Sequence, residues 1–252
     1  MVFQVLISTL QSDASPFLGK AIPTLVISQS GKNEHFISGN VEFLAFSERG
    51  LSKSRNRAIE NTRAKIALIA DDDVKFVPDF DKKIISAFTR YPDADIITFR
   101  VRTPEGLPYK KSYLEHSFTH SRTSIYKTSS VEIALRPDKI KLKGVRFDES
   151  FGLGAKYSSG EEVIFLNDCI NSGLSLRYVP EEIVIHPLES SGKILDENYF
   201  KSKGAIVRRL YGSSPGLLIG LGFLLKQLIK SGKTISFVAA LRAILKGFFA
   251  KN

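Results

Sequence analysis

The sequence predicts an α/β fold with a mostly parallel central sheet flanked by helices, followed by an amphipathic helical tail at the C-terminus. Up to about residue 185, short apolar runs typical of buried strands alternate with segments of helix length. From Pro215 onward, apolar stretches are interrupted at short intervals by lysine and arginine. A chain of 252 residues is long enough for one large domain with such a tail.

The first hundred residues follow a strand-helix-strand order. A polar helix is expected from about Ser52 to Thr62, and a second helix from Asp79 to Tyr91, where apolar residues recur at helical spacing. Strands are expected at residues 2–10, 24–28, 41–46, 66–70 and 94–101. Because a helix connects most of these strands, we expect the strands to run parallel.

The second hundred residues are less regular. Residues 103–130 carry prolines, glycine, basic residues and aromatics, and we interpret them as loops and an irregular sheet under a substrate site. A strand is expected at residues 131–137, and a Gly-rich loop then leads to a helix at residues 161–171 and a final strand that ends in IVIHP.

The net charge of +10 is concentrated at one end of the chain. Residues 201–252 hold ten Lys or Arg and no Asp or Glu, whereas residues 1–200 hold 26 of each sign. An uncharged run of the tail at residues 213–225 is shorter than the ~20 apolar residues that span a bilayer. We expect the tail to lie on an anionic membrane surface; the alternative is that its helices pack on their own domain.

The single cysteine, Cys169, excludes an internal disulfide and lies in an apolar helical pattern, so we interpret it as a core residue. The N-terminal segment lacks the features of a secretory signal, which leads us to expect a cytoplasmic protein, peripheral on the inner face of the membrane. The four histidines are too scattered for a zinc cluster: His35, His116, His120 and His186.

Asp71, Asp72 and Asp73 directly follow a buried strand, at the edge of the sheet where open α/β folds bind ligands. Carboxylates in this position can hold Mg²⁺ or Mn²⁺, which keep substrate phosphates and water in their coordination shell. The alternative is a surface turn, in which aspartate is common. His186, at the end of the last strand, is a further candidate ligand if the two strand ends meet.

Glu161 and Glu162 stand at the start of a helix, beside the loop FGLGAKYSSG. A carboxylate there could remove a proton from an acceptor hydroxyl. The alternative is helix capping, because Ser159 and Glu162 also match a capping box. Lys53, Arg55 and other basic residues at the start of an earlier helix could meet a phosphate, although such a face is also commonly only solvated.

Taken in order, the segments VLIST, GLSKSRNRAIENT, IALIADDDV and FGLGAKYSSGEEVIFL resemble the family 2 glycosyltransferases, especially enzymes of bacterial capsular or exopolysaccharide synthesis. The resemblance covers roughly residues 2–210 and implies a GT-A fold, which is Rossmann-like. It implies a nucleotide-sugar-binding half at residues 1–100, an acceptor-binding half at 101–200, and the basic tail at 201–252.

The resemblance also implies roles for individual residues. Glu162 would be the catalytic base and Glu161 would contact the acceptor or support the base, although which of the two is the base stays open. Asp71, Asp73 and, from its position, His186 would hold Mn²⁺ or Mg²⁺. The nucleotide-sugar donor would meet Thr9, Gln29, Ser52, Arg55, Asn56, Asp71 and Asp72. Two departures stand out, since Glu162 replaces the usual Asp and Gln29 replaces a nucleobase-binding Asp.

The expected function is therefore inverting, metal-dependent transfer of a hexose from a nucleotide sugar, a UDP-sugar above others, to a lipid-linked saccharide. One alternative is a sugar-nucleotide nucleotidyltransferase, but no Gly-rich phosphate loop follows the first strand. Another is a noncatalytic protein that binds membranes or nucleic acid through its basic residues. The neutral body of the chain and the absence of a recognisable motif argue against nucleic acid.

Overall fold

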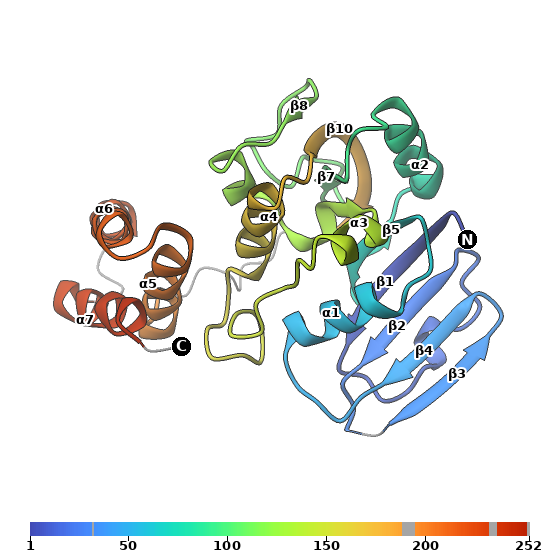
Figure 1. The fold of residues 1–252 in the computed structure, drawn as a ribbon, viewed down its shortest axis with the longest axis horizontal. Coiled ribbons are helices and arrows are strands. Elements are labelled where there is room, and N and C mark those ends of the chain that lie inside the picture. The colour runs from blue at the N-terminus through green and yellow to red at the C-terminus, as the bar shows by residue number, and fades with distance from the viewer. Residues whose placement is uncertain (32, 188–194, 232–235, 251–252) are drawn as a thin grey trace.

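The computed structural model describes residues 1–31, 33–187, 195–231 and 236–250 (Figure 1). Its centre is one sheet with the strand order β3-β4-β2-β1-β5-β9-β7-β10-β6, and β8 pairs with β10 beside this path. The strands are β1 Phe3–Thr9, β2 Thr24–Ser28, β3 Glu34–Ser38, β4 Val41–Ala45, β5 Ile66–Asp71, β6 Lys75–Phe76, β7 Ile96–Arg102, β8 Phe118–Thr119, β9 Ile133–Leu135 and β10 Leu176–Ile185.

Helices cover the sheet and form the C-terminal part of the chain. The α-helices are α1 Leu51–Asn61, α2 Phe80–Arg90, α3 Pro137–Leu142, α4 Glu161–Asn171, α5 Glu197–Tyr211, α6 Ser214–Ser231 and α7 Phe237–Phe248. Short 3-10 turns occur at Ser15–Phe17, Ser124–Lys127 and Ser130–Glu132. The structure confirms the predicted α/β fold with helices on the sheet and a helical tail.

The sheet is parallel at its centre and antiparallel elsewhere. Strand β1 lies parallel to β2 and β5, β2 is parallel to β4, and β7 is parallel to β10. The short β9 is inserted antiparallel between β5 and β7, and β3 forms an antiparallel edge beside β4. Every residue of β3 is exposed, so this strand has no apolar run from which the sequence could predict it.

The alternation of side chains along the strands builds one apolar core on each face of the sheet. Val5 packs with the core under α2, which includes Ile84. Its neighbour Leu6 points to the other face and packs with Ile59 of α1 and Phe165 of α4. Successive side chains of a strand point to opposite faces, so both faces of β1 are buried, as its continuous apolar run requires.

Parallel pairing brings the carboxyl ends of several strands to one edge of the sheet. In the β1–β5 pair, Ser8 is in register with Asp71, so Thr9 and the three aspartates leave the sheet side by side. Helix α1 begins at the same edge after β4, and β10 ends there at Ile185. Ligands of open α/β sheets bind outside these ends.

The tail forms a group of three helices beside α4 (Figure 1). Phe200 of α5, Leu224 of α6 and Ile244 of α7 form its core. Helix α5 begins at Glu197, ahead of the expected start of the tail, and it also packs on the main domain, because Ile206 contacts the core around Ile164 of α4. Among the described residues, none of the helices combines the length and apolar character needed to cross a membrane.

Candidate active site

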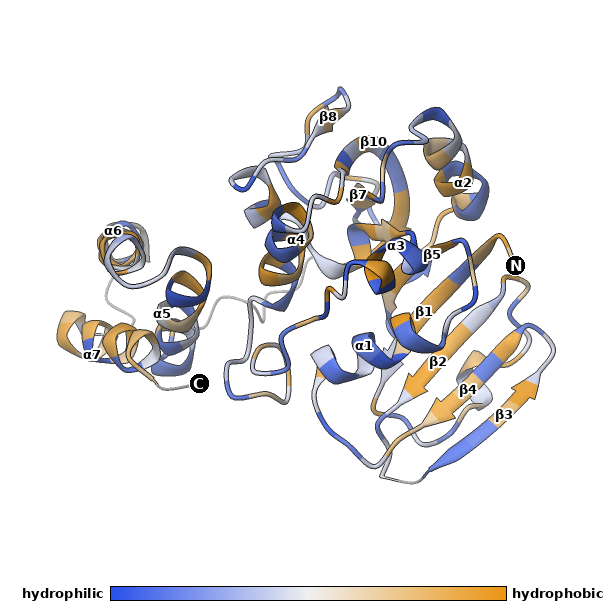
Figure 2. Ribbon diagram, viewed as in Figure 1, coloured by the Kyte–Doolittle hydropathy of each residue, from blue (hydrophilic) through white to orange (hydrophobic). Residues whose placement is uncertain are grey.

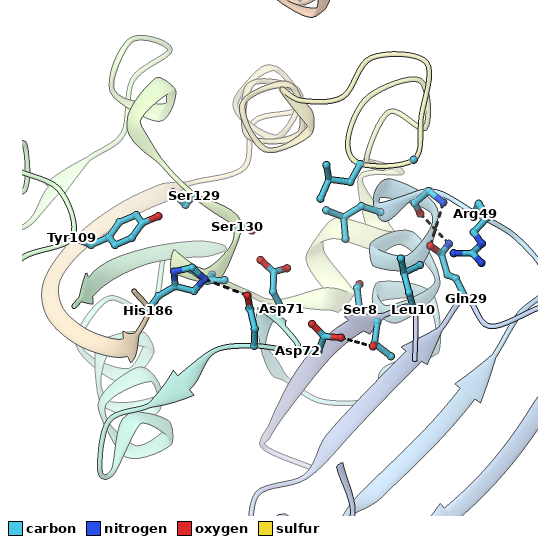
Figure 3. Close-up of a pocket in the computed structure, with 17 residues that line it drawn as sticks. Ser8, Leu10, Gln29, Arg49, Asp71, Asp72, Tyr109, Ser129, Ser130 and His186 are labelled. Carbon is cyan, nitrogen blue, oxygen red and sulfur yellow. Dashed lines mark hydrogen bonds and ion pairs between the residues drawn. The ribbon is translucent and has the colours of Figure 1, made fainter. Parts of the chain in front are cut away.

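A cavity of about 490 Å³ opens at the carboxyl ends of the central strands (Figure 3). In Figure 3, Asp71 and Asp72 lie in its middle, Tyr109, Ser129 and His186 on one side, and Gln29 and Arg49 on the other. It is lined by Ser8, Thr9, Leu10, Gln29, Arg49, Gly50, Leu51, Asp71, Asp72, Asp73, Tyr109, Ser129, Ser130, Val131, Leu153, Gly154 and His186.

Asp72 is held by the end of β1. The hydroxyl of Thr9 donates a hydrogen bond of 2.5 Å to Oδ2 of Asp72, and the side-chain amide of Gln11 approaches the same oxygen at 3.4 Å. This contact fixes one carboxylate of the aspartate run against the neighbouring parallel strand. Asp72 is therefore oriented before any ligand arrives.

Arg55 joins the aspartate run to the glutamate pair. Its guanidinium lies 3.2 Å from Oδ1 of Asp71, 3.3 Å from Oε1 of Glu161 and 3.7 Å from Oε1 of Glu162. The Arg55 side chain is only 2% exposed. Its burial opposes the charged form, but the three carboxylates outweigh burial and raise its pKa. One buried cation therefore holds two motifs that are 90 residues apart in the sequence.

The two glutamates have different environments. Glu161 is 4% exposed, and its Oε2 atom has no hydrogen-bond partner among the described residues. Burial and the charge of Glu162 raise the pKa of Glu161 to about 7, against the lowering effect of Arg55. The side chain of Glu162 is 23% exposed and reaches solvent. Glu162 is thus the more accessible of the two carboxylates.

The Gly-rich loop after β9 and α3 is fixed to the start of α1. The backbone N–H of Leu51 donates to the carbonyl of Leu153, and the hydroxyl of Ser52 donates to the carbonyl of Phe151 at 2.6 Å. Gly152 has a φ of +104°, and a Cβ there would lie 3.2 Å from the carboxyl carbon of Glu161. Glycine therefore lets this loop lie against the glutamate pair.

Asp73 and His186 meet at the opposite side of the cavity. Nε2 of His186 lies 3.7 Å from Oδ2 of Asp73, and its Nδ1 lies 2.7 Å from the carbonyl oxygen of Pro187. A proton on Nδ1 satisfies that carbonyl, so in the neutral ring the Nε2 lone pair is directed toward a carboxylate. The two side chains thus place one ring nitrogen and one carboxylate oxygen close together beside the cavity.

The family model "Glycosyl transferase family 2" matches residues 30–142, a range that includes α1 and the aspartate run. Over this range the chain is similar to the family 2 glycosyltransferases. It is accordingly an enzyme of the glycosyltransferase class, as the order of its motifs indicated. No curated protein sequence matches the chain significantly.

Solved structures with a similar fold include the S. aureus protein TarS. A crystal structure of TarS 1-349 in complex with UDP-GlcNAc superposes with a TM-score of 0.66 at 14% identity, covering 98% of this chain and 82% of that one. A second crystal structure of TarS 1-349 gives a TM-score of 0.62 at 14% identity, with coverages of 98% and 81%. At this identity the similarity shows the fold, and it agrees with the predicted GT-A architecture.

The cavity is lined by six of the eleven residues of the predicted site, and Arg55, Glu161 and Glu162 are not among its lining residues. Thr9, Gln29, Asp71, Asp72, Asp73 and His186 line it. Gln29 is buried with both ends of its amide bonded to the backbone of Gly50, so it shapes the entry to α1. Its contact with a nucleobase stays a prediction.

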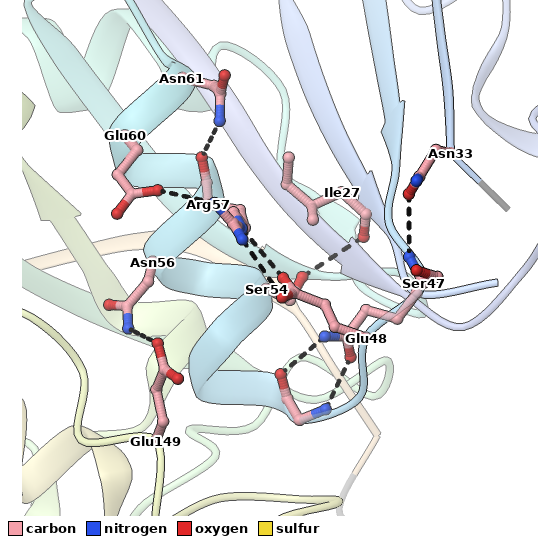
Figure 4. Close-up of polar contacts among 12 residues, drawn as sticks. Ile27, Asn33, Ser47, Glu48, Ser54, Asn56, Arg57, Glu60, Asn61 and Glu149 are labelled. Carbon is pink, nitrogen blue, oxygen red and sulfur yellow. Dashed lines mark hydrogen bonds and ion pairs between the residues drawn. The ribbon is translucent and has the colours of Figure 1, made fainter. Parts of the chain in front are cut away.

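Ser52 and Asn56 lie outside the lining of the cavity. Asn56 donates to the carbonyl of Phe147 at 3.0 Å and to Glu149 at 3.1 Å (Figure 4). Arg57, another basic residue of α1, is paired with Glu48 at 3.1 Å. In this arrangement these side chains attach α1 to neighbouring loops, and a role for Ser52 and Asn56 in donor binding stays untested.

The metal ligands predicted from sequence are only partly brought together. Asp73 and His186 are neighbours, whereas Oδ1 of Asp71 is paired with the guanidinium of Arg55. Within the described ranges, no three His, Cys, Asp or Glu side chains form a group that could hold a metal by themselves.

Several cavity residues were absent from the sequence prediction. Arg49 and Gly50 immediately precede the basic segment of α1, so the sequence could have indicated that they lie near the predicted phosphate site. Tyr109 and Ser129–Val131 come from the irregular region between β7 and β9. No periodic pattern marks them, because only the path of these loops brings them to the cavity.

Proposed function

We propose that this enzyme transfers a hexose from a UDP-sugar to a saccharide acceptor with inversion at the anomeric carbon. The observation that carries the proposal is the Arg55 network, which joins Asp71 in the donor cavity to Glu161 and Glu162. A donor site and a proton acceptor must lie within one substrate length for direct displacement. The network supports this because a single guanidinium contacts both groups.

The donor half of the proposal rests on the cavity at the sheet edge. Its volume of about 490 Å³ suits a nucleotide sugar. The S. aureus protein TarS, which shares the fold, has been crystallised in complex with UDP and with UDP-GlcNAc. Thr9 orients Asp72, and we assign Asp71 and Asp72 to the ribose and diphosphate side of the donor.

Asp73 and His186 suit a divalent metal as a partial ligand set. Mg²⁺ and Mn²⁺ commonly take one or two protein groups and complete their coordination with substrate phosphates and water. The directed Nε2 of His186 and the 58% exposed side chain of Asp73 offer one nitrogen and one oxygen beside the cavity. When bound, the metal would stabilise the negative charge on the departing nucleoside diphosphate.

Glu162 is assigned as the general base, because its carboxylate is accessible and lies beside the Arg55 network. It would accept the proton of the acceptor hydroxyl as that oxygen forms a bond to the anomeric carbon and the bond to the diphosphate breaks. Glu161 would support it by occupying the buried side of Arg55 and keeping the guanidinium in place.

The acceptor is assigned as a lipid-linked saccharide of bacterial surface polysaccharide synthesis, capsule or exopolysaccharide. This assignment is supported by the tail, which exposes apolar Leu218, Leu225 and Phe237 among basic residues. Such a surface suits the anionic cytoplasmic leaflet, where lipid-linked acceptors would be held. Residues 1–100 then bind the donor, 101–200 the acceptor and 201–252 the membrane.

The test of the base is the Glu162→Gln variant, which keeps the shape of the side chain and removes its basicity. Sugar transfer, including slow transfer to water, should fall by about 10²-fold or more, while stabilisation of the fold by UDP and Mn²⁺ persists. Glu161→Gln should retain more activity than Glu162→Gln. The control is Glu181→Gln on β10, whose partner is Arg90, outside the cavity. Undiminished transfer by Glu162→Gln would reject the assignment.

A further inference from the structure

A second cavity of about 410 Å³ lies under the irregular region between β7 and β9. No residue lines both this cavity and the donor cavity. It is lined by Lys110, Ser112, Tyr113, Leu114, Phe118, His120, Thr123, Ser124, Lys127, Thr128 and Tyr178. The function proposed above leaves this space without a ligand.

The two cavities adjoin at two places in the chain. Tyr109 lines the donor cavity and Lys110 the second one. Likewise, Ser129 lines the donor cavity and Thr128 the second one. Consecutive Cα atoms are only about 3.8 Å apart, so the linings of the two cavities meet along two chain segments. A saccharide held in the second cavity would therefore lie close to the donor cavity.

Aromatic rings form one wall of the second cavity. Tyr178 of β10 stacks on Phe118 of β8, with ring centroids 4.9 Å apart, and on Tyr113 at 6.4 Å. Phe118 also meets His120 edge to face at 5.1 Å. The C–H faces of sugar rings pack on such aromatic surfaces, which give contact area at a small cost in conformational freedom.

Apart from Lys127, the polar side chains around the cavity are uncharged or paired with an opposite charge. Burial lowers the pKa of His120 to about 4, so the ring is neutral at physiological pH. Its nitrogens lie 2.7 Å from the Thr98 hydroxyl and 2.9 Å from the Ser124 hydroxyl. The ammonium group of Lys110 lies 2.6 Å from the carboxylate of buried Glu132. Hydroxyl-rich, charge-compensated linings suit a neutral polyhydroxyl ligand better than a free anion.

We propose that the second cavity is a saccharide-binding site that holds the sugar units of the acceptor next to the one that receives the new residue. The inference rests on the proposed function for its place in the reaction, because the adjoining donor cavity supplies the transferred sugar. Binding of a neutral oligosaccharide to this cavity is independent of the donor and can be measured without turnover.

The experiment measures saturation-transfer NMR from the full-length protein to maltotriose, cellotriose and the trimer of N-acetylglucosamine, each in the presence of saturating UDP. The test variant is Phe118→Ala, which removes one ring of the aromatic wall from a short edge strand. The matched control is Phe36→Ala in edge strand β3, outside both cavities. This substitution removes a ring that stacks on Phe43 of β4. Circular dichroism and UDP binding establish that both variants are folded.

We expect at least one trisaccharide to bind to the wild type and to Phe36→Ala, and its affinity to fall about tenfold or more in Phe118→Ala. UDP should not displace it. Absence of binding by all three sugars, unchanged binding to Phe118→Ala, or displacement by UDP would each overturn the proposal.

The donor reaction separates this inference from the proposed function. The rate at which water hydrolyses the UDP-sugar donor and sets UDP free should be equal in wild type and Phe118→Ala, because Phe118 does not line the donor cavity. If the wild type releases no nucleotide from any donor, the proposed function fails while the saccharide test still gives its own answer. If release is normal and no sugar binds, only the second site is rejected.

Discussion

At the scale of single residues, the site is organised by the charge of Arg55. Its guanidinium is buried among the carboxylates of Asp71, Glu161 and Glu162. The guanidinium carbon also lies 5.7 Å from the centre of the Phe147 ring. Three carboxylates around one cation leave an excess of negative charge, and the protein meets this excess by holding Glu161 in an environment that favours its protonated form. The same excess is available to a metal or to a positively charged transition state.

The raised pKa of Glu161 predicts a specific dependence of stability on pH. Its pKa is about 7 in the folded protein and about 4.5 when unperturbed. Between these values the unfolded chain has lost the proton that the folded state keeps, so the free energy of unfolding decreases as pH rises from about 4.5 to 7. The stabilising contribution of the Glu161 proton is fully present below about pH 4.5 and is lost above about pH 7.

The comparison of wild type with Glu161→Gln isolates this effect, since glutamine keeps the shape without the titration. The melting temperature of the wild type should fall relative to the variant between pH 5 and 7, by several degrees, because about 1 kcal/mol corresponds to roughly 2–4 °C in a chain of this size. Parallel melting curves over this range for the two proteins would contradict the assigned pKa.

At the scale of elements, the sequence predicted the strands and helices whose side chains form long apolar patterns. The expected helix at residues 161–171 is observed as α4 with those bounds, and the strand at 24–28 is observed as β2. The strand expected at residues 131–137 is observed only as the three-residue β9, whereas the exposed β3 and the short α3 were not predicted. Their formation depends on pairing or packing with distant segments, and they are too short to show a period.

Which residues of the site could be predicted also depends on whether they adjoin a regular helix or strand. Asp71 and Glu162 follow or begin regular elements, so their location could be inferred from the element pattern. Tyr109 and the second cavity depend on loops between β7 and β9. Arg55 was assigned to the nucleotide half, but its role as the link to the glutamates required the fold, since Glu161 is 106 residues away.

The contact between α5 and α7 depends on glycine. A Cβ built on Gly204 would lie 2.0 Å from the carbonyl oxygen of Ile244, and one on Gly247 would lie 1.9 Å from that of Lys201. Neither backbone can move away without opening the core of the tail. Glycine at these two positions therefore permits the close approach of the two helices.

Gly204→Ala should accordingly destabilise the protein by about 1–3 kcal/mol through overpacking, measured by chemical denaturation. The matched control is Gly222→Ala on α6, where nothing lies within 4 Å of the added methyl group. That variant should be neutral or more stable by about 0.5–1 kcal/mol, since alanine is the better helix former. Equal stability of the two variants would show that the α5–α7 contact is not as close as described.

At the scale of the whole molecule, the basic tail packs beside the start of α4, where Glu161 and Glu162 lie. Helix α5 is bound to the main domain by Arg209, which pairs with Asp148 at 3.0 Å and Asp168 at 2.7 Å. A Cβ on Gly160, next to Glu161, would collide with Ile206 of α5 at 2.4 Å. The alternative that the tail packs on its own domain is thus realised by α5, while α6 and α7 pack on α5 and expose apolar residues (Figure 2).

This arrangement predicts binding to anionic vesicles through α6. The full chain should sediment with vesicles that contain phosphatidylglycerol and bind phosphatidylcholine vesicles weakly, because the tail carries only positive charge. Leu218→Asp, at a residue 72% exposed on α6, should reduce sedimentation. Leu142→Asp, at a residue 78% exposed on α3, should leave it unchanged. Equal loss in both variants, or none in either, would contradict docking through the tail.

The most direct test of the central claim is release of free nucleoside diphosphate from a panel of nucleotide sugars, with and without Mn²⁺, by wild type and Asp73→Asn. We predict release from one donor, a UDP-sugar, that depends on the metal and is reduced about 10²-fold or more in the variant. Equal release by both proteins would contradict the role of Asp73 and its metal, and no release from any donor by the wild type would contradict the proposed transfer itself.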